Sequence, residues 1–158
     1  MRKKLNFAIL FYVLLIALGV SGCAHGAGQF ENAPVNKIEG EHKMQTLKIN
    51  INGQRFTAML YDNAATQKLV QNLPVTLNMK DLHGNEKYYY LDTSLPVKAQ
   101  HIGKINAGDI MLFGSDCLVV FYESFNTSYS YTPIGKIENA AGLKKVVGRG
   151  SVKVEFSL

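Results

Sequence analysis

Two apolar runs joined by a short polar turn constrain the fold of this chain more than any other stretch. The runs Ile110–Phe113 and Leu118–Tyr122 contain four and five consecutive apolar or aromatic residues, and Gly114-Ser115-Asp116 separates them. Short apolar runs bounded by Gly, Ser and Asp are typical of buried strands. A three-residue connection that begins with glycine suits a tight hairpin. We therefore predict a β-hairpin at the centre of a sheet.

Further strands are predicted on both sides of this hairpin. Thr46–Ile51 and Gln54–Leu60 alternate between apolar and polar residues, and Asn52-Gly53 between them is the strongest short hairpin signal. Similar patterns predict the later strands Val75–Met79, Lys87–Leu91 and Ile134–Ile137, and a last strand in which Val152, Val154 and Phe156 alternate with polar residues.

Two short helices complete the predicted set of elements. Asp62 or Asn63 can cap a helix over Ala64–Asn72, and Asn139 can cap a second over Ala140–Val147. The polar stretch from Asp92 to Ala107 is predicted to wind over the surface. About eight closely spaced strands and two helices in residues 44–158 predict a mainly β fold, a closed β-barrel with two capping helices.

The first 22 residues have the organisation of a signal peptide. A positive start is followed by the apolar run Phe7–Leu18, which is too short for a membrane span of about 20 residues. The sequence Val20-Ser21-Gly22-Cys23 resembles a bacterial lipoprotein box. This resemblance implies cleavage before Cys23 and attachment of lipid chains such as palmitate to its thiol. An ordinary secretory signal with an incidental cysteine is the alternative.

The lipoprotein interpretation places the protein in the bacterial cell envelope. Its lipid anchor would hold it on the outer side of the cytoplasmic membrane or in the outer membrane, with membrane lipid as its first partner. Residues 23–43, rich in Gly, Ala, Asn and charge, are predicted to be a flexible tether to the domain at 44–158.

Charge and cysteine content limit the possible functions. The 17 basic residues fall to 14 without Arg2, Lys3 and Lys4, and against 12 acidic residues the net charge is +2. Such a weak positive charge predicts no nucleic-acid partner. Because Cys23 would be lipidated, Cys117 has no disulfide partner, and its place beside an apolar run predicts a buried structural thiol.

Several stretches of residues 44–158 together carry a family resemblance. They are Leu73-Pro74, His83-Gly84-Asn85-Glu86-Lys87-Tyr88, Ser94-Leu95-Pro96, Ile105-Asn106-Ala107-Gly108-Asp109, Phe121-Tyr122, Ser128-Tyr129-Ser130-Tyr131 and Ile134-Gly135-Lys136-Ile137. With the order of elements, they resemble the cyclophilin-like domain family of bacterial secreted proteins. The resemblance implies a cyclophilin β-barrel with two capping helices.

The resemblance carries a catalytic expectation that the residues do not meet. Cyclophilins are prolyl isomerases that use an arginine in a Phe-His-Arg segment. The matching segment here, Glu86–Leu91, contains no arginine, and Lys87 lacks the planar fork of a guanidinium. We therefore assign no catalytic residue and expect non-catalytic binding, with weak peptidyl-prolyl isomerase activity on secreted proteins as the alternative.

Aromatic residues supply the candidate binding site. Tyr129 and Tyr131 lie in a predicted polar loop, where a ring with a hydroxyl suits a peptide-binding groove. The predicted cleft for a peptide, protein or small ligand contains Tyr90, Phe113, Phe121, Tyr129 and Tyr131. Core packing of the tyrosines, in a structural module without a cleft, is a third hypothesis. The spacing of the four histidines predicts no metal site, and no cofactor motif is present.

Overall fold

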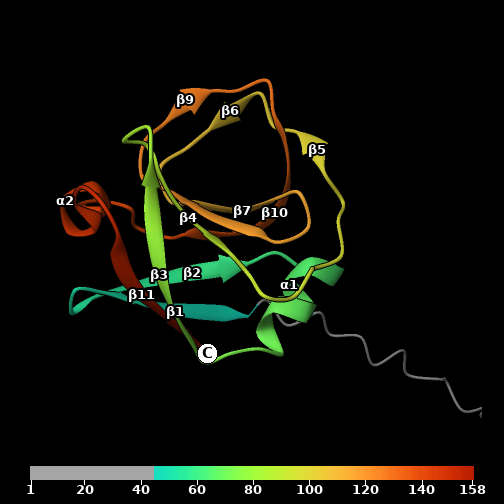
Figure 1. Ribbon diagram of the computed structural model, residues 1–158, viewed down its shortest axis with the longest axis horizontal. Coiled ribbons are helices and arrows are strands. Elements are labelled where there is room, and N and C mark those ends of the chain that lie inside the picture. The colour runs from blue at the N-terminus through green and yellow to red at the C-terminus, as the bar shows by residue number, and fades with distance from the viewer. Residues whose placement is uncertain (1–44) are drawn as a thin grey trace, which may run out of the picture. The chain divides into compact units, whose positions relative to one another are not determined.

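Strands make up most of the regular structure in the computed structural model, which describes residues 45–158 (Figure 1). The predicted signal peptide (1–22), the predicted tether (23–43) and the predicted lipidation site Cys23 lie outside the described residues. The described elements are β1 Thr46–Ile51, β2 Gln54–Leu60, α1 Ala64–Val70, β3 Val75–Leu82, β4 Glu86–Tyr90, β5 Gln100–His101, β6 Lys104–Ile105, β7 Asp109–Phe113, β8 Cys117–Phe121, β9 Phe125–Asn126, β10 Ser130–Ile137, α2 Leu143–Val147 and β11 Val152–Ser157.

Eight of these strands close an antiparallel barrel. Their hydrogen-bonded order is β2-β1-β11-β3-β4-β8-β7-β10, and β10 pairs back with β2 in the register Gly135↔Leu60. Closure leaves no open edge between the first and last strands of that order. The predicted mainly β class, with a closed barrel of about eight strands and two helices, is confirmed. The predicted central hairpin is β7–β8, which occupies one part of a closed wall.

The β1–β2 hairpin forms as its sequence predicts. Asn52 and Gly53 have φ angles of 50° and 80°, as a two-residue turn with the twist of the flanking strands requires. The register pairs Ile51 with Gln54, so the apolar residues of both strands fall on one face. The buried residues on that face are Leu47, Ile49, Ile51, Phe56, Ala58 and Leu60.

The two helices cover opposite ends of the barrel interior, as expected. Helix α1 directly follows the end of β2 and buries Ala65 and Leu69 in the interior core. Helix α2 lies at the other end of β2, where the Asn52 side chain donates a 3.0 Å hydrogen bond to the Val146 carbonyl. Figure 1 shows the two helices on opposite sides of the barrel.

The helix boundaries differ from the predicted ones. Asn63 caps α1 by accepting a 3.0 Å hydrogen bond from the Thr66 amide, but the helix ends at Val70 rather than Asn72. Helix α2 begins at Leu143 because Gly142, with φ of 79°, interrupts the helical backbone. Asn139 therefore caps only a turn, accepting from the Ala141 amide at 3.0 Å.

The outer face of the wall carries a second hydrophobic cluster. Along β7 and β8, Leu112 and Leu118 belong to the interior core, whereas their neighbours on the opposite face form a cluster of Ile105, Met111, Cys117, Val119, Phe121 and Tyr131. The short strands β6 and β9 pair through Lys104↔Asn126 and Ile105↔Phe125. Ile105 of β6 belongs to this cluster, and Phe125 of β9 packs against it. The β6–β9 ribbon, at the top of Figure 1, therefore packs on the outer face of the barrel.

The prediction for residues 92–107 holds for the exposed majority of the stretch but is wrong for two apolar residues, Leu95 in the interior core and Ile105 in the outer cluster. That stretch was expected to be a polar surface segment, yet Leu95 is 3% exposed and Ile105 is fully buried. It also forms β5 and β6. Isolated apolar residues in a polar segment show no periodicity. The sequence pattern therefore does not indicate that they are buried against strands far away in the chain.

Candidate functional site

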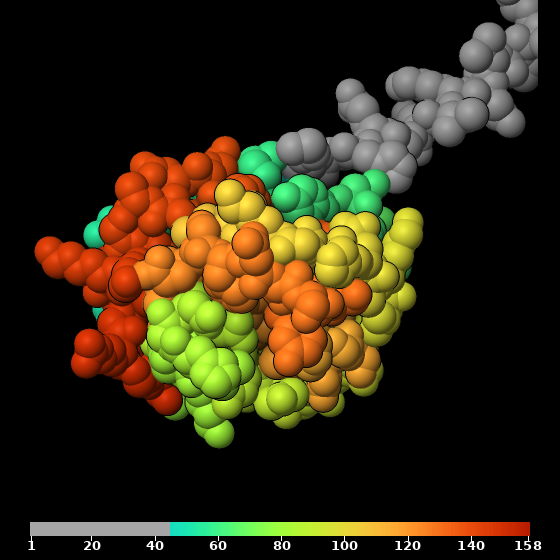
Figure 2. Space-filling model, turned by 90° about the horizontal axis from the view of Figure 1, so that it is seen from above, coloured from blue at the N-terminus to red at the C-terminus, as the bar shows by residue number. Residues whose placement is uncertain are grey.

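A cavity of about 510 Å³ opens on the outer face of the barrel wall, and we call it the tyrosine groove. Its volume lies within the range of small-molecule sites. Two chain segments supply most of its walls, and Figure 2 shows them meeting at the surface, the β3–β4 turn in lime green and the region of β9 in orange. The lining residues are Leu82, His83, Asn85, Glu86, Tyr88, Tyr90, Phe113, Cys117, Val119, Phe125, Asn126, Thr127, Ser128, Tyr129 and Tyr131.

The structure brings four of the five predicted site residues together. Tyr90, Phe113, Tyr129 and Tyr131 all line the tyrosine groove. Phe121 does not line it, because it is fully buried beneath the surface with its ring 5.8 Å from the ring of Phe125. Phe121 lies on the outer face of β8, but the β6–β9 ribbon covers it.

Tyr131 occupies a different setting from the predicted polar loop. It lies on β10, which begins at Ser130, and only 6% of it is exposed. Burial raises the pKa of its hydroxyl above the ordinary value. Tyr131 therefore forms the floor of the groove, while Tyr90 and Tyr129, at 60% and 62% exposed, form its rim.

Aromatic rings link the rim to the floor. The Phe113 ring lies 5.9 Å from Tyr129 and 5.6 Å from Tyr131, and Tyr131 in turn lies 5.6 Å from Phe121. The Tyr129 and Phe121 contacts are edge-to-face, an arrangement that aromatic rings prefer. This ring network fixes the floor in position but leaves the faces of the exposed rim residues available to a ligand.

Glu86 is the carboxylate among the groove residues that the sequence analysis did not assign to the site. It is partly buried, and burial together with the charge of Asp81 raises the pKa of its carboxyl group to about 7. The alternation of β4 contained the signal, because Glu86 precedes Tyr88 and Tyr90 by steps of two and therefore shares their face.

Cys117 lies in the groove wall as a buried free thiol. Burial, with a smaller contribution from the charge of Glu86, raises its pKa to about 11. Reactive cysteines have depressed pKa values and electropositive surroundings. The thiol is therefore a structural group, as the sequence analysis expected.

Lys87 lies on the interior side of β4 and is fully buried. Its ammonium group donates to Asp81 Oδ2 at 2.7 Å and to the carbonyls of Gly148 and Gly150 at 2.9 and 2.7 Å. All three of its donors are thus used. Tyr122 donates its hydroxyl to the same Asp81 oxygen at 2.6 Å. Lys87 is consequently unable to reach a ligand in the groove.

The Asp81 carboxyl group responds to this network. Burial by itself raises its pKa, but hydrogen bonds from Lys87, Tyr122 and the Gly84 amide outweigh burial and hold the pKa below its ordinary value. Burial of the Tyr122 hydroxyl and its hydrogen bond to Asp81 raise the pKa of Tyr122. The network is therefore a charged structural unit at the α2 end of the barrel.

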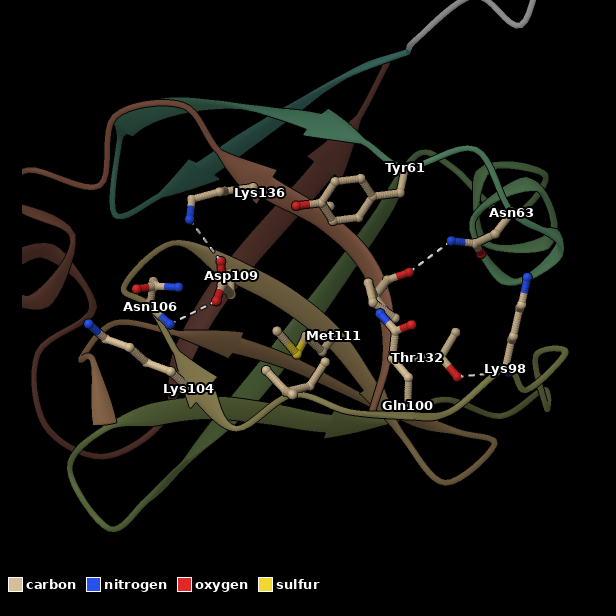
Figure 3. Close-up of a pocket in the computed structure, with 13 residues that line it drawn as sticks. Tyr61, Asn63, Lys98, Gln100, Lys104, Asn106, Asp109, Met111, Thr132 and Lys136 are labelled. Carbon is tan, nitrogen blue, oxygen red and sulfur yellow. Dashed lines mark hydrogen bonds and ion pairs between the residues drawn. The ribbon is translucent and has the colours of Figure 1, made fainter. Parts of the chain in front are cut away.

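A second cavity of about 470 Å³, which we call the lysine pocket, is lined by residues of β5, β6, β7 and β10 (Figure 3). It is lined by Tyr61, Asn63, Lys98, Gln100, Ile102, Lys104, Asn106, Asp109, Met111, Thr132, Pro133, Gly135 and Lys136.

Some of the polar groups of the lysine pocket are paired within the protein. Asp109 pairs with Lys136 at 3.2 Å and accepts from the Asn106 amide at 2.7 Å, while the Asn63 side chain donates to the Pro133 carbonyl. The ammonium groups of Lys98 and Lys104 point to different sides of the cavity (Figure 3). The arrangement supports the loops of the barrel and does not converge on a ligand.

Residues 45–158 contain neither a metal-binding cluster nor a membrane-spanning helix. No group of three or more His, Cys, Asp or Glu side chains in this range is placed to hold a metal ion. Within the same range, no helix has the length and apolar character needed to cross a membrane.

Comparisons with known proteins agree on the fold. The model of a family described as the Cyclophilin-like family matches residues 49–157. Among solved structures, the chain is similar to the solution structure of the hypothetical protein AF2241 from Archaeoglobus fulgidus, with 17% sequence identity and a TM-score of 0.54. That likeness covers 72% of this chain and 94% of the archaeal one. A comparison with curated proteins gave no match.

Proposed function

This chain belongs to the Cyclophilin-like family, and from that premise we propose that it binds a peptide or small ligand in the tyrosine groove without catalysing a reaction. A family fold hosts many functions, so the proposal depends on the chemistry of the groove. We propose further that a lipid on Cys23 anchors the protein in the cell envelope. The sequence Val20-Ser21-Gly22-Cys23 supports this anchoring.

The distribution of exposed apolar surface carries the proposal. Seven large hydrophobic residues are exposed in the described part of the chain, and four of them, Leu82, Tyr90, Phe113 and Tyr129, line the tyrosine groove. Exposed apolar side chains scattered singly are normal, whereas a cluster around a concavity is typical of a binding site. The tyrosine hydroxyls can orient a ligand that the rings hold.

The charges around the groove favour binding over prolyl isomerisation. Stabilising a twisted amide needs fixed donors aimed at its developing lone pair. The residues that line the groove include no arginine and no lysine. Lys87, the cation nearest in sequence to the groove's tyrosines, uses its three donors inside the barrel. We therefore expect no acceleration of prolyl isomerisation by the full-length protein above the uncatalysed rate.

A binding experiment with matched tyrosine variants tests the proposal. The full-length protein in lipid nanodiscs would be titrated by calorimetry with short peptides that contain a central proline. Tyr129→Ala removes a rim ring, and the loss of an aromatic contact of about 1 kcal/mol weakens binding roughly fivefold. Tyr61→Ala is the control, because Tyr61 is 46% exposed but lines the lysine pocket. Equal loss in both variants, or no binding by the unaltered protein, would contradict the proposal.

A further inference from the structure

We propose that the ligand of the tyrosine groove carries a positively charged group, and that this group binds between the Glu86 carboxylate and the tyrosine rings. The inference rests on the proposed function, since it names the chemistry of a ligand for the same groove. It is carried by the position of Glu86, by its lack of a partner, and by the aromatic residues around it.

Glu86 lies in the groove wall on the outer face of β4. It is opposite Phe121 in the β4–β8 pairing and shares its face with Tyr88 and Tyr90. Its carboxylate makes no hydrogen bond or ion pair with any residue in 45–158. A partly buried carboxylate without a partner is unfavourable, because burial removes water and supplies no donor in return.

The other groups of the wall do not supply the missing cation. Asn85, also in the lining, has a buried side-chain oxygen with no hydrogen-bond partner among the described residues. That oxygen is closed to solvent, so the acceptor offered to a ligand is the Glu86 carboxylate, in a lining free of lysine and arginine. A ligand that brings an ammonium or guanidinium group would meet this need.

The tyrosine rings favour the same ligand. The face of an aromatic ring attracts a cation within about 6 Å of the ring centroid. Tyr88 and Tyr90 stand edge to face at 5.8 Å on the strand that carries Glu86, and Tyr129 presents an exposed ring across the groove. Because rings alone bind apolar groups as well, it is the carboxylate among them that selects a cationic group.

The proposed contact depends on pH. The titratable groups around Glu86 are Asp81 on β3, His83 in the turn, Tyr88 and Tyr90 on its own strand, Cys117 on β8, Tyr122 directly after β8 and Tyr131 on β10. Burial and the charge of Asp81 raise the pKa of Glu86 to about 7. A cation binds the ionised form, so its affinity rises as the pH increases through about 7, and binding at neutral pH releases protons.

A peptide pair that differs only in charge tests the inference. Two proline-containing peptides, one with arginine and one with the neutral isostere citrulline beside the proline, would be titrated into the full-length protein in nanodiscs. At pH 8 we expect the arginine peptide to bind at least tenfold tighter. The ratio should fall toward one at pH 5.5. It should also fall in Glu86→Gln at pH 8, but remain in the control Glu138→Gln, whose exposed carboxylate lies outside the groove.

The outcomes separate this inference from the proposed function. Equal affinity for both peptides at pH 8 would overturn the inference and leave the groove a binding site for neutral ligands. A preference that persists in Glu86→Gln would also overturn it, because the cation would then bind elsewhere. Binding of neither peptide would refute both proposals. Should Glu86→Gln fail to fold, the pH comparison on the unaltered protein still decides.

Discussion

Replacing Lys87 with methionine should destabilise the α2 end of the barrel more than the replacement of an exposed residue does. Lys87→Met keeps the length of the side chain but removes the ammonium group from Asp81 and from the carbonyls of Gly148 and Gly150. Removing one partner of a buried ion pair costs about 3–5 kcal/mol. Because the Asp81 side chain is 22% exposed and regains some water, we expect the lower limit, about 3 kcal/mol.

Thermal unfolding of the full-length protein, followed by circular dichroism, measures this effect. A loss of about 3 kcal/mol in a domain of this size lowers Tm by roughly 10–15 °C. Lys153→Met is the matched control, because Lys153 is exposed on β11 and should tolerate the change within about 0.5 kcal/mol. The double variant with Asp81→Asn should lose less than the sum of the single changes, since the two side chains are in contact.

The pH dependence gives a second measurement of the same network. The pKa of Asp81 is lower in the folded protein than in the unfolded chain, so its ionised form adds stability above the unfolded value of about 3.9. That contribution disappears as the pH falls through the lower folded value. The stability difference between the unaltered protein and Lys87→Met should therefore shrink in acid. A difference below about 1 kcal/mol at pH 7 would refute the reasoning.

Three other changes follow from the structure. Gly135→Ala should destabilise the barrel by about 2–3 kcal/mol in urea unfolding, because an added Cβ would lie 2.7 Å from the Met59 carbonyl oxygen; no loss would show that β10 can shift away from β2. Asn63→Ala should cost about 1 kcal/mol in the same assay through loss of the α1 cap, and an unchanged midpoint would contradict that role. Glu86→Gln should raise stability at pH 8 but not at pH 4, because the raised folded pKa of about 7 makes ionisation unfavourable to folding as the pH increases; equal effects at both pH values would argue against an unpaired carboxylate.

The strands were predictable wherever the sequence specifies both the turn and the exposed face. The β1–β2 hairpin follows from the alternation of its residues and from Asn52-Gly53, and its predicted bounds are confirmed. The predicted start of β10 was wrong, because Tyr131 stands among Ser and Thr in the sequence and is buried by residues of other strands, Phe113 and Phe121 among them. Local patterns contain no information on such distant packing.

The candidate site was only partly predictable for a related reason. Tyr90, Phe113 and Tyr131 came together because they lie on the outer face of the barrel wall, and Tyr129 joins them from the segment between β9 and β10. The covering of Phe121 instead depends on residues 102–105 and 125. The fully buried Lys87 had no local signal, since its acceptors at Gly148 and Gly150 lie more than sixty residues later in the chain.

The floor and the outer lip of the tyrosine groove are held by different numbers of backbone hydrogen bonds. Its floor belongs to the continuous hydrogen-bonded wall of β4, β8, β7 and β10, on which barrel closure depends. Its outer lip, around β9, is held by two paired residues of β6 and by the hydrogen bond from the Thr127 amide to the Gly103 carbonyl. Substitutions in residues 126–129 can consequently alter ligand preference while the barrel stays intact. We therefore expect this lip to be the segment to vary when the groove is engineered for a new ligand.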